Sequence, residues 1–149
     1  MQDDTEIADT LDAHYQRVSR AVHAAGGRVI KFIGDATMLV FPENAVDSGV
    51  SAIFDLMASE DRLMQQHGWE CRLHAKAHFG TVVAGEFGAN GDRRFDVFGK
   101  AVNATARLKG TAPFMLSAEA HELLSQGLRQ RFTRQPSGTT YGAETSLAP

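Results

Sequence analysis

The sequence is poor in cysteine and has no long apolar run, and each shortage excludes a class of protein. Cys71 is the only cysteine in 149 residues, so no disulfide can form within the chain, which suits a reducing compartment. No apolar segment approaches the roughly 20 residues that span a bilayer. The first ten residues, MQDDTEIADT, are acidic and polar, unlike a secretory signal. We therefore expect a cytoplasmic domain that makes no membrane contact.

The sequence also lacks an excess of charge of either sign. Fifteen Lys and Arg stand against eighteen Asp and Glu, which gives a net charge of −3. Because no basic stripe is present, binding of nucleic acid by bulk electrostatics is not expected. Hydrophobic residues make up 43% and charged residues 22%, an ordinary globular composition in a chain long enough for one domain.

Periodicity predicts an alternation of helices and hairpins. Apolar residues at helical spacing indicate a helix over residues 7–22, which Gly26-Gly27 ends. Two strands then flank Gly34-Asp35, a hairpin signal. The first two strands and the later elements are expected at residues 29–33 and 37–41 (strands), 45–66 (helix), 71–79 and 82–84 (strands), 85–91 (mobile loop), 95–98 (strand), 101–109 (helix), 114–116 (strand) and 118–125 (helix). Ser117 is the expected N-cap of the last helix.

This alternation favours an α+β sandwich with one sheet and helices on one face of it. Residues 131–149 are rich in Ser, Thr and Gly, so we expect a poorly ordered C-terminal tail after a domain of residues 1–130.

Two polar side chains interrupt the first hairpin. Lys31 shares strand parity with Val29 and Ile33, so it projects from a face that is otherwise apolar. A buried lysine needs a partner, although a lysine on an edge strand can reach solvent. Asp35 occupies a Gly-Asp turn, where aspartate is also common without any functional role.

Three further polar side chains follow in the second half of the chain. Asp96 lies between aromatic and β-branched residues, where a carboxylate is costly unless it accepts hydrogen bonds. Asn103 and Arg107 are four residues apart and share one helix face. An amide and a guanidinium presented together suit a phosphate or sugar-phosphate ligand, and a plain solvated face is the alternative.

Together and in order, these segments resemble the catalytic domain of the class III adenylyl and guanylyl cyclases. The resemblance runs from about Thr5 to Ser117 and rests on GRVIKFIGDA, HFGTVVAG, and RFDVFG leading into VNATAR. Each motif alone is weak, but three in the right order in a domain of the right size indicate the family. The resemblance implies a ferredoxin-like α/β sandwich of the nucleotidyl cyclase type, with an antiparallel sheet.

The resemblance also implies a role for each polar residue. Lys31 and Asp96 match the pair that reads the purine edge, and a lysine with a carboxylate suits adenine. Guanine-specific members commonly carry Glu where Lys31 stands. Asn103 matches the residue that positions the ribose, and Arg107 the one that stabilises charge on the α-phosphate. Asp35 matches one of two aspartates that bind Mg²⁺ or Mn²⁺.

The implied reaction converts ATP to 3′,5′-cyclic AMP and pyrophosphate in signal transduction, the work of a phosphorus–oxygen lyase. The family acts as a head-to-tail homodimer with its sites at the interface. The purine pair and the Asn/Arg pair then come from opposite subunits.

The sequence departs from the family at two places. The first metal-binding aspartate normally lies on a central strand upstream of the first helix. Asp3 and Asp4 instead stand at the helix entrance, so we do not take either as a ligand. We expect the missing strand to lie outside this sequence and the 149-residue chain alone to have little activity. The lysine that holds the triphosphate has no clear counterpart, with Arg131 and Arg134 as loose candidates.

Three interpretations therefore stay open. The first is an adenylate cyclase catalytic domain lacking its first strand. The second is a catalytically impaired homologue that binds nucleotide or acts as a dimerisation or regulatory module. The third is an unrelated α+β domain with chance matches, which three ordered motifs disfavour.

Overall fold

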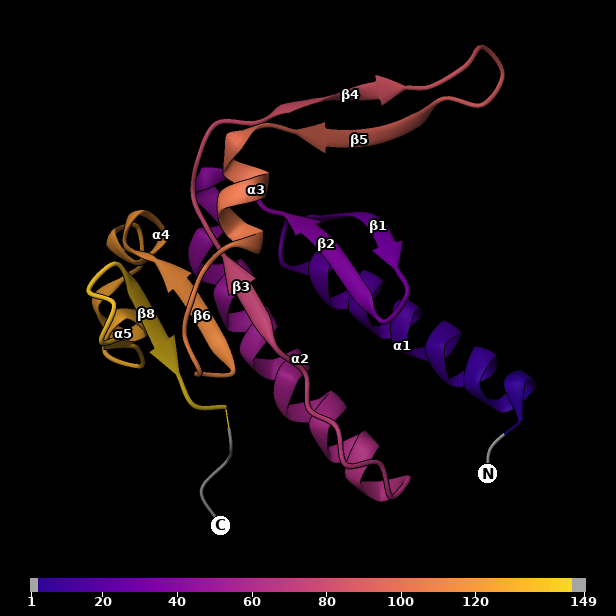
Figure 1. The fold of residues 1–149 in the computed structure, drawn as a ribbon, viewed down its shortest axis with the longest axis horizontal. Coiled ribbons are helices and arrows are strands. Elements are labelled where there is room, and N and C mark those ends of the chain that lie inside the picture. Colours follow the sequence, from indigo (N-terminus) through magenta and orange to yellow (C-terminus); the bar gives the residue numbers. More distant parts are fainter. Residues whose placement is uncertain (1–2, 146–149) are drawn as a thin grey trace. The chain divides into compact units, whose positions relative to one another are not determined.

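The computed structural model describes residues 3–145, drawn in Figure 1. The chain divides into two compact units, Met1–Leu56 and Met57–Pro149. The division falls inside helix α2, Val46–Gln66. Among the described residues, no helix has the length and apolar character required to cross a bilayer.

The first unit packs a helix on a hairpin. Helix α1 (Asp4–Ala24) precedes strands β1 (Arg28–Ile33) and β2 (Ala36–Val40), and a short 3₁₀ turn, η1 (Glu43–Ala45), leads into α2. Asp3 caps α1, because its carboxylate accepts a hydrogen bond of 2.8 Å from the amide of Glu6. The core comprises Val18, Val22 and Leu56, with Ala21, Val29, Leu39 and Phe41 packed against it.

The second unit contains a four-stranded sheet and a separate two-stranded ribbon. The sheet has the order β3-β6-β8-β7, in which β3 and β6 run parallel and the other neighbours antiparallel. The ribbon joins β4 to β5. The elements in chain order are β3 (Ala75–Ala77), β4 (Val83–Phe87), β5 (Arg94–Phe98), α3 (Lys100–Ala106), β6 (Phe114–Ser117), α4 (Ala118–Glu122), α5 (Gln126–Arg129), β7 (Thr133–Arg134) and β8 (Thr140–Ala143).

Strand β6 lies at the centre of the hydrophobic core of the second unit. All four of its residues are buried, and Phe114 meets the ring of Phe132 edge to face, with ring centroids 5.3 Å apart. Ser117 ends the strand and caps α4 by accepting a hydrogen bond from the amide of Ala120, as predicted.

The predicted α+β class is confirmed, but the strands differ in two respects from the expectation. The described strands form three sheets rather than one. The strand predicted over residues 71–79 covers only Ala75–Ala77, because the carboxylate of Asp61 accepts the amide of Leu73 at 2.7 Å and holds the preceding segment out of the sheet.

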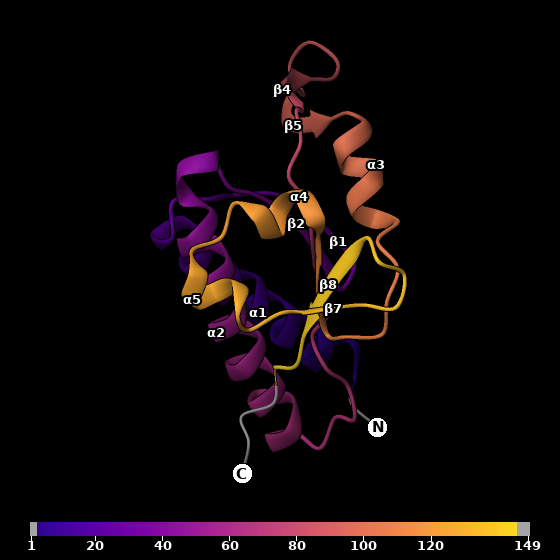
Figure 2. The same cartoon turned by 90° about the vertical axis from the view of Figure 1, so that its left-hand side faces the viewer.

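The prediction of a poorly ordered tail is wrong for the part of the tail that the structure describes, residues 131–145. Phe132 is buried, and β7 and β8 lie side by side in the sheet (Figure 2). Strand β8 pairs with β6, so that even Thr140 is buried. A run of Ser, Thr and Gly resembles a loop until a partner strand supplies its hydrogen bonds.

The predicted loop of residues 85–91 is likewise shorter than expected. Gly85 lies within β4, opposite Asp96 of β5, and the ribbon extends to the pair of Phe87 and Arg94. A glycine in a strand often marks close approach of another backbone or ligand rather than a loop.

Candidate functional site

A shift of register places Lys31 differently from the prediction. Val29 pairs with Leu39 and Lys31 with Met38, so β1 contains one extra residue between these two pairs. This irregularity reverses the alternation, and Lys31 lies on the sheet face opposite Val29. The prediction that both share one face is wrong. Lys31 still shares a face with Ile33, which is 57% exposed, and its own side chain is exposed.

Asp35 lies at the tip of the same hairpin. Gly34 and Asp35 form the two-residue loop between the pair of Ile33 and Ala36, and Gly34 has φ +60°. That left-handed value is what a type II′ turn needs at its first loop position. The hydroxyl of Tyr15 on α1 donates a hydrogen bond to the carbonyl of Gly34. The turn thus holds the exposed carboxylate of Asp35 on a loop that is fixed to α1.

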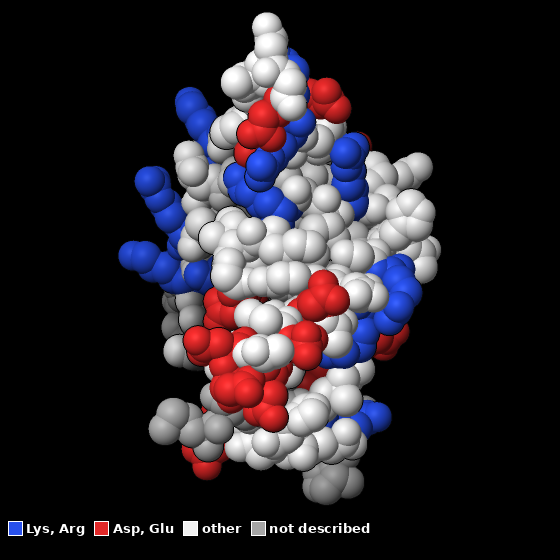
Figure 3. Space-filling model, turned by 90° about the vertical axis from the view of Figure 1, so that its right-hand side faces the viewer, with Lys and Arg blue, Asp and Glu red and all other residues white. Residues whose placement is uncertain are grey.

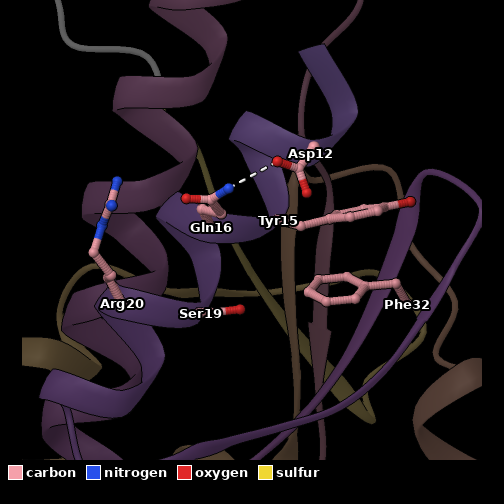
Figure 4. Close-up of a pocket in the computed structure, with 6 residues that line it drawn as sticks. All are labelled: Asp12, Tyr15, Gln16, Ser19, Arg20 and Phe32. Carbon is pink, nitrogen blue, oxygen red and sulfur yellow. Dashed lines mark hydrogen bonds between the residues drawn. The ribbon is translucent and has the colours of Figure 1, made fainter. Parts of the chain in front are cut away.

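The sequence gives no signal of this contact, because Tyr15 fits the apolar face of the helix predicted over residues 7–22. Its ring stacks on Phe32 of β1, with centroids 3.9 Å apart. The two rings border a shallow cavity of about 370 Å³ (Figure 4). Its lining residues are Asp12, Tyr15, Gln16, Ser19, Arg20 and Phe32. None of the predicted site residues lines this cavity, so it is not the predicted nucleotide site.

Carboxylates gather on the exposed surface of α1. Figure 3 shows that Asp and Glu side chains form a group on the face of the molecule that it draws. The exposed acidic residues on and just before α1 are Asp3, Asp4, Glu6, Asp9 and Asp12. Asp3 serves as the helix cap, and acidic residues in a first turn complement the helix dipole. Across residues 3–145 no three side chains of His, Cys, Asp or Glu are arranged to hold a metal ion. The assignment of Asp35 as a metal ligand stays a prediction.

Asp96 lies in β5 of the second unit and is partly buried. One of its carboxylate oxygens, Oδ1, accepts a hydrogen bond of 2.8 Å from the amide of Val97, which is only 2% exposed. This bond gives the half-buried carboxylate the hydrogen-bond partner that its place in a strand requires.

Asn103 and Arg107 keep the relation predicted from their spacing, although the helix is shorter than expected. Helix α3 ends at Ala106, and Arg107 is its C-cap residue with φ −91°. The amide of Arg107 donates to the carbonyl of Asn103 at 3.2 Å, which is the contact of residues one helical turn apart. Both side chains are exposed.

The structure brings the predicted residues together in two groups. Lys31 and Asp35 lie on one hairpin of the first unit. Asp96, Asn103 and Arg107 lie on consecutive elements of the second unit, since β5 ends at Phe98 and α3 begins at Lys100. The pairing of Lys31 with Asp96 stays a prediction.

Comparison with known sequences places this fold in a family. A family model described as the adenylate and guanylate cyclase catalytic domain matches residues 1–141. Adenylate cyclase 2 of Rhizobium meliloti (strain 1021) is 31% identical over 114 residues, which are 72% of this chain and 31% of that protein. An adenylate cyclase of Anabaena cylindrica is 27% identical over 113 residues, 70% of this chain and 22% of that protein. The chain thus spans less than a third of the length of these relatives.

Solved structures agree on the fold. A bacterial light-regulated adenylyl cyclase has a TM-score of 0.77 at 20% identity, covering 99% of this chain and 48% of the other. The guanylyl cyclase Cya2 has a TM-score of 0.73 at 17% identity, covering 95% and 83%. A class III adenylyl cyclase-like ATP-binding protein from Pseudomonas aeruginosa has a TM-score of 0.66 at 18% identity, covering 91% and 32%. The predicted nucleotidyl cyclase type of fold is confirmed, and the chain belongs to the family of adenylate and guanylate cyclase catalytic domains.

Proposed function

We propose that this domain is an adenylate cyclase, which converts ATP to 3′,5′-cyclic AMP and pyrophosphate. The observation that carries the proposal is the joint presence of Lys31, Asp96, Asn103 and Arg107 in a chain of this family. Adenylyl and guanylyl cyclases both occur among its structural neighbours, so the base must be inferred from the side chains. A carboxylate can accept a hydrogen bond from the amino group of adenine, and a lysine can donate one to a ring nitrogen of the base.

Cyclisation forms one bond and breaks another at the α-phosphorus. The ribose 3′-oxygen attacks in line and loses its proton, while the oxygen that bridges to the β-phosphate leaves with pyrophosphate. Asn103 would hold the ribose through its side-chain amide. Arg107 would stabilise the negative charge that develops on the α-phosphoryl oxygens, since a guanidinium can donate two parallel hydrogen bonds to them.

Asp35 fits a role as ligand of a divalent cation. Its carboxylate is exposed on a fixed turn, and carboxylate oxygen is the ligand that Mg²⁺ and Mn²⁺ prefer. Mg²⁺ commonly takes only one or two carboxylates beside phosphates and water. When bound, such an ion would lower the pKa of the attacking hydroxyl and neutralise charge on the leaving group.

We further propose that the active form is a head-to-tail homodimer in the cytoplasm, where ATP is available. In this arrangement Lys31 and Asp96 of one subunit face Asn103 and Arg107 of the other. The two pairs then complete a site only at the interface.

The test is an assay of ATP and GTP with Mg²⁺ and with Mn²⁺. It uses the 149-residue chain and the longest open reading frame that contains it, and measures cyclic nucleotide and pyrophosphate by chromatography. We expect cyclic AMP from the longer protein and little from the 149-residue chain, which offers a single carboxylate toward the metal. The absence of product from the longer protein at saturating metal would refute the proposal.

A second function has one observation in its favour. A structural neighbour is described as a cyclase-like ATP-binding protein. A homologue that binds nucleotide without turnover would show saturable binding of ATP in calorimetry and no cyclic product in the same assay.

A further inference from the structure

Helix α3 contains Asn103 and ends at its C-cap residue Arg107, and no residue of the helix is fully buried. It comprises seven residues. Its first residue follows Gly99, which makes no side-chain cap hydrogen bond. A short, exposed helix of this kind is marginal in isolation, so the position of Arg107 at its end depends on contacts from other elements.

One such contact reaches the C-terminal end of α3. The ammonium of Lys76 in β3 donates a hydrogen bond of 3.2 Å to the carbonyl of Ala106. Ala106 is the last residue of the helix, so this carbonyl is among those left without a partner inside it. A positive charge at this end also complements the helix dipole.

The strand that carries Lys76 is well anchored. Lys76 pairs with Met115 of β6, which is 2% exposed, in the parallel part of the sheet. Two residues later, the ring of His78 lies 2.8 Å from the hydroxyl of Ser117, the residue that caps α4. The base of the Lys76 side chain is therefore fixed on β3, next to the fully buried strand β6.

The segment after β3 approaches the other end of α3. A methyl group built on Gly80 would lie 2.8 Å from the Cβ atom of Ala101, closer than such atoms pack. The chain from Lys76 to Gly80 thus contacts α3 near its start and at its end.

We propose that Lys76 is a positioning residue that fixes the guanidinium of Arg107 for cyclisation. The ammonium holds the peptide unit from which Arg107 extends, and it has no contact with substrate in this role. The inference rests on the proposed function, since it assumes that Arg107 acts on the α-phosphate. It adds a residue of β3 to the machinery of that reaction.

The first test measures the contact without reference to activity. Hydrogen exchange of residues 100–108 is followed by mass spectrometry in the wild type and in Lys76→Met, Lys76→Arg and Lys109→Met. Lys109 is the matched control: it lies two residues beyond Arg107, and its substitution removes the same charge but leaves the bond to Ala106 intact. We expect exchange about two- to fivefold faster in Lys76→Met alone, as expected for loss of a charged helix cap. Equal exchange in all four proteins would overturn the inference, whether or not the protein is a cyclase.

The second test measures turnover in the form that makes cyclic AMP. We expect Lys76→Met to lower kcat about tenfold with little change in the KM for ATP, because the interaction acts in the transition state. Lys76→Arg should restore most of the rate, and Lys109→Met should resemble the wild type. Faster exchange in Lys76→Met with an unchanged kcat would refute the positioning role. A wild type without product would refute the proposed function and leave the exchange result to decide the contact.

Discussion

At the scale of the residue, the sequence could identify the polar side chains but could not orient all of them. The two-residue periodicity of a regular strand places Lys31 on the same face as Val29, but one extra residue in β1 moves it to the opposite face. A bulge of this kind is set by the pairing of β1 with β2, so the residue pattern of β1 alone cannot reveal it. The relation of Asn103 to Arg107 was predictable because it depends only on the local helical turn.

The proposed contact of Lys31 with the purine can be tested by reversing its charge. In Lys31→Glu, the donor becomes an acceptor, so the preference for ATP over GTP should fall by about tenfold or more. The measurement is kcat/KM for both nucleotides at saturating metal. The control is Lys109→Glu, which makes the same change of charge outside the proposed site. Equal use of ATP and GTP by the wild type would contradict the assignment of the purine pair.

The proposed role of Arg107 predicts a different kinetic signature. Removal of a group that acts only on developing charge lowers kcat while KM changes little. We expect Arg107→Ala to lower kcat by about 10²-fold or more, a typical effect for such a donor. Arg107→Lys keeps the charge without the planar fork and should recover only part of the rate. A rise in KM with an unchanged kcat would show that Arg107 serves ground-state binding instead.

At the scale of the element, the two long helices and the first hairpin were predictable, whereas α5 and the last strands were not. Residues 7–22 and 45–66 carry apolar stripes that repeat locally, and both lie in helices. Strands β7 and β8 are too short and too polar to show a pattern. Strand β8 pairs with β6, which lies more than twenty residues earlier in the chain, and β7 in turn pairs with β8. Contacts between distant segments of this kind leave no local signal.

The place of β8 in the sheet predicts that Gly142 cannot accept a side chain. A methyl group there would lie 2.5 Å from the Cβ atom of Ala112 and 2.7 Å from Nε2 of Gln135. We expect Gly142→Ala to lower the free energy of unfolding by about 1–3 kcal/mol, as overpacking does. The measurement is urea denaturation.

Gly127 provides the matched control for that experiment. It lies in α5 of the same unit, and a methyl group built there meets nothing within 4 Å. Gly127→Ala should leave stability unchanged or raise it by about 0.5–1 kcal/mol, because alanine favours a helix over glycine. Equal stability of the two variants would show that residues 140–143 do not form a packed strand in solution.

At the scale of the whole molecule, the proposed head-to-tail dimer divides each site between two copies of the chain. In a head-to-tail dimer each site takes its purine pair from one subunit and its Asn/Arg pair from the partner. A variant in either pair then damages both sites of a homodimer, while a mixed dimer keeps one site intact.

This arrangement predicts complementation between two variants whose substitutions lie in different pairs. Lys31→Ala and Arg107→Ala are purified separately in the form that makes cyclic AMP, then mixed in equal amounts under conditions that allow exchange of subunits. In a mixed dimer, one site carries both substitutions and the other carries neither. Because half of the dimers are mixed and one of their two sites is intact, we expect about 25% of the wild-type rate.

Two different variants of the same pair, Asn103→Ala and Arg107→Ala, serve as the control. Their mixture leaves one substitution in every site, so it should stay near the rates of the separate proteins. If mixing Lys31→Ala with Arg107→Ala restores nothing while gel filtration shows that subunits exchange, then all four residues act within one subunit and the divided site is wrong.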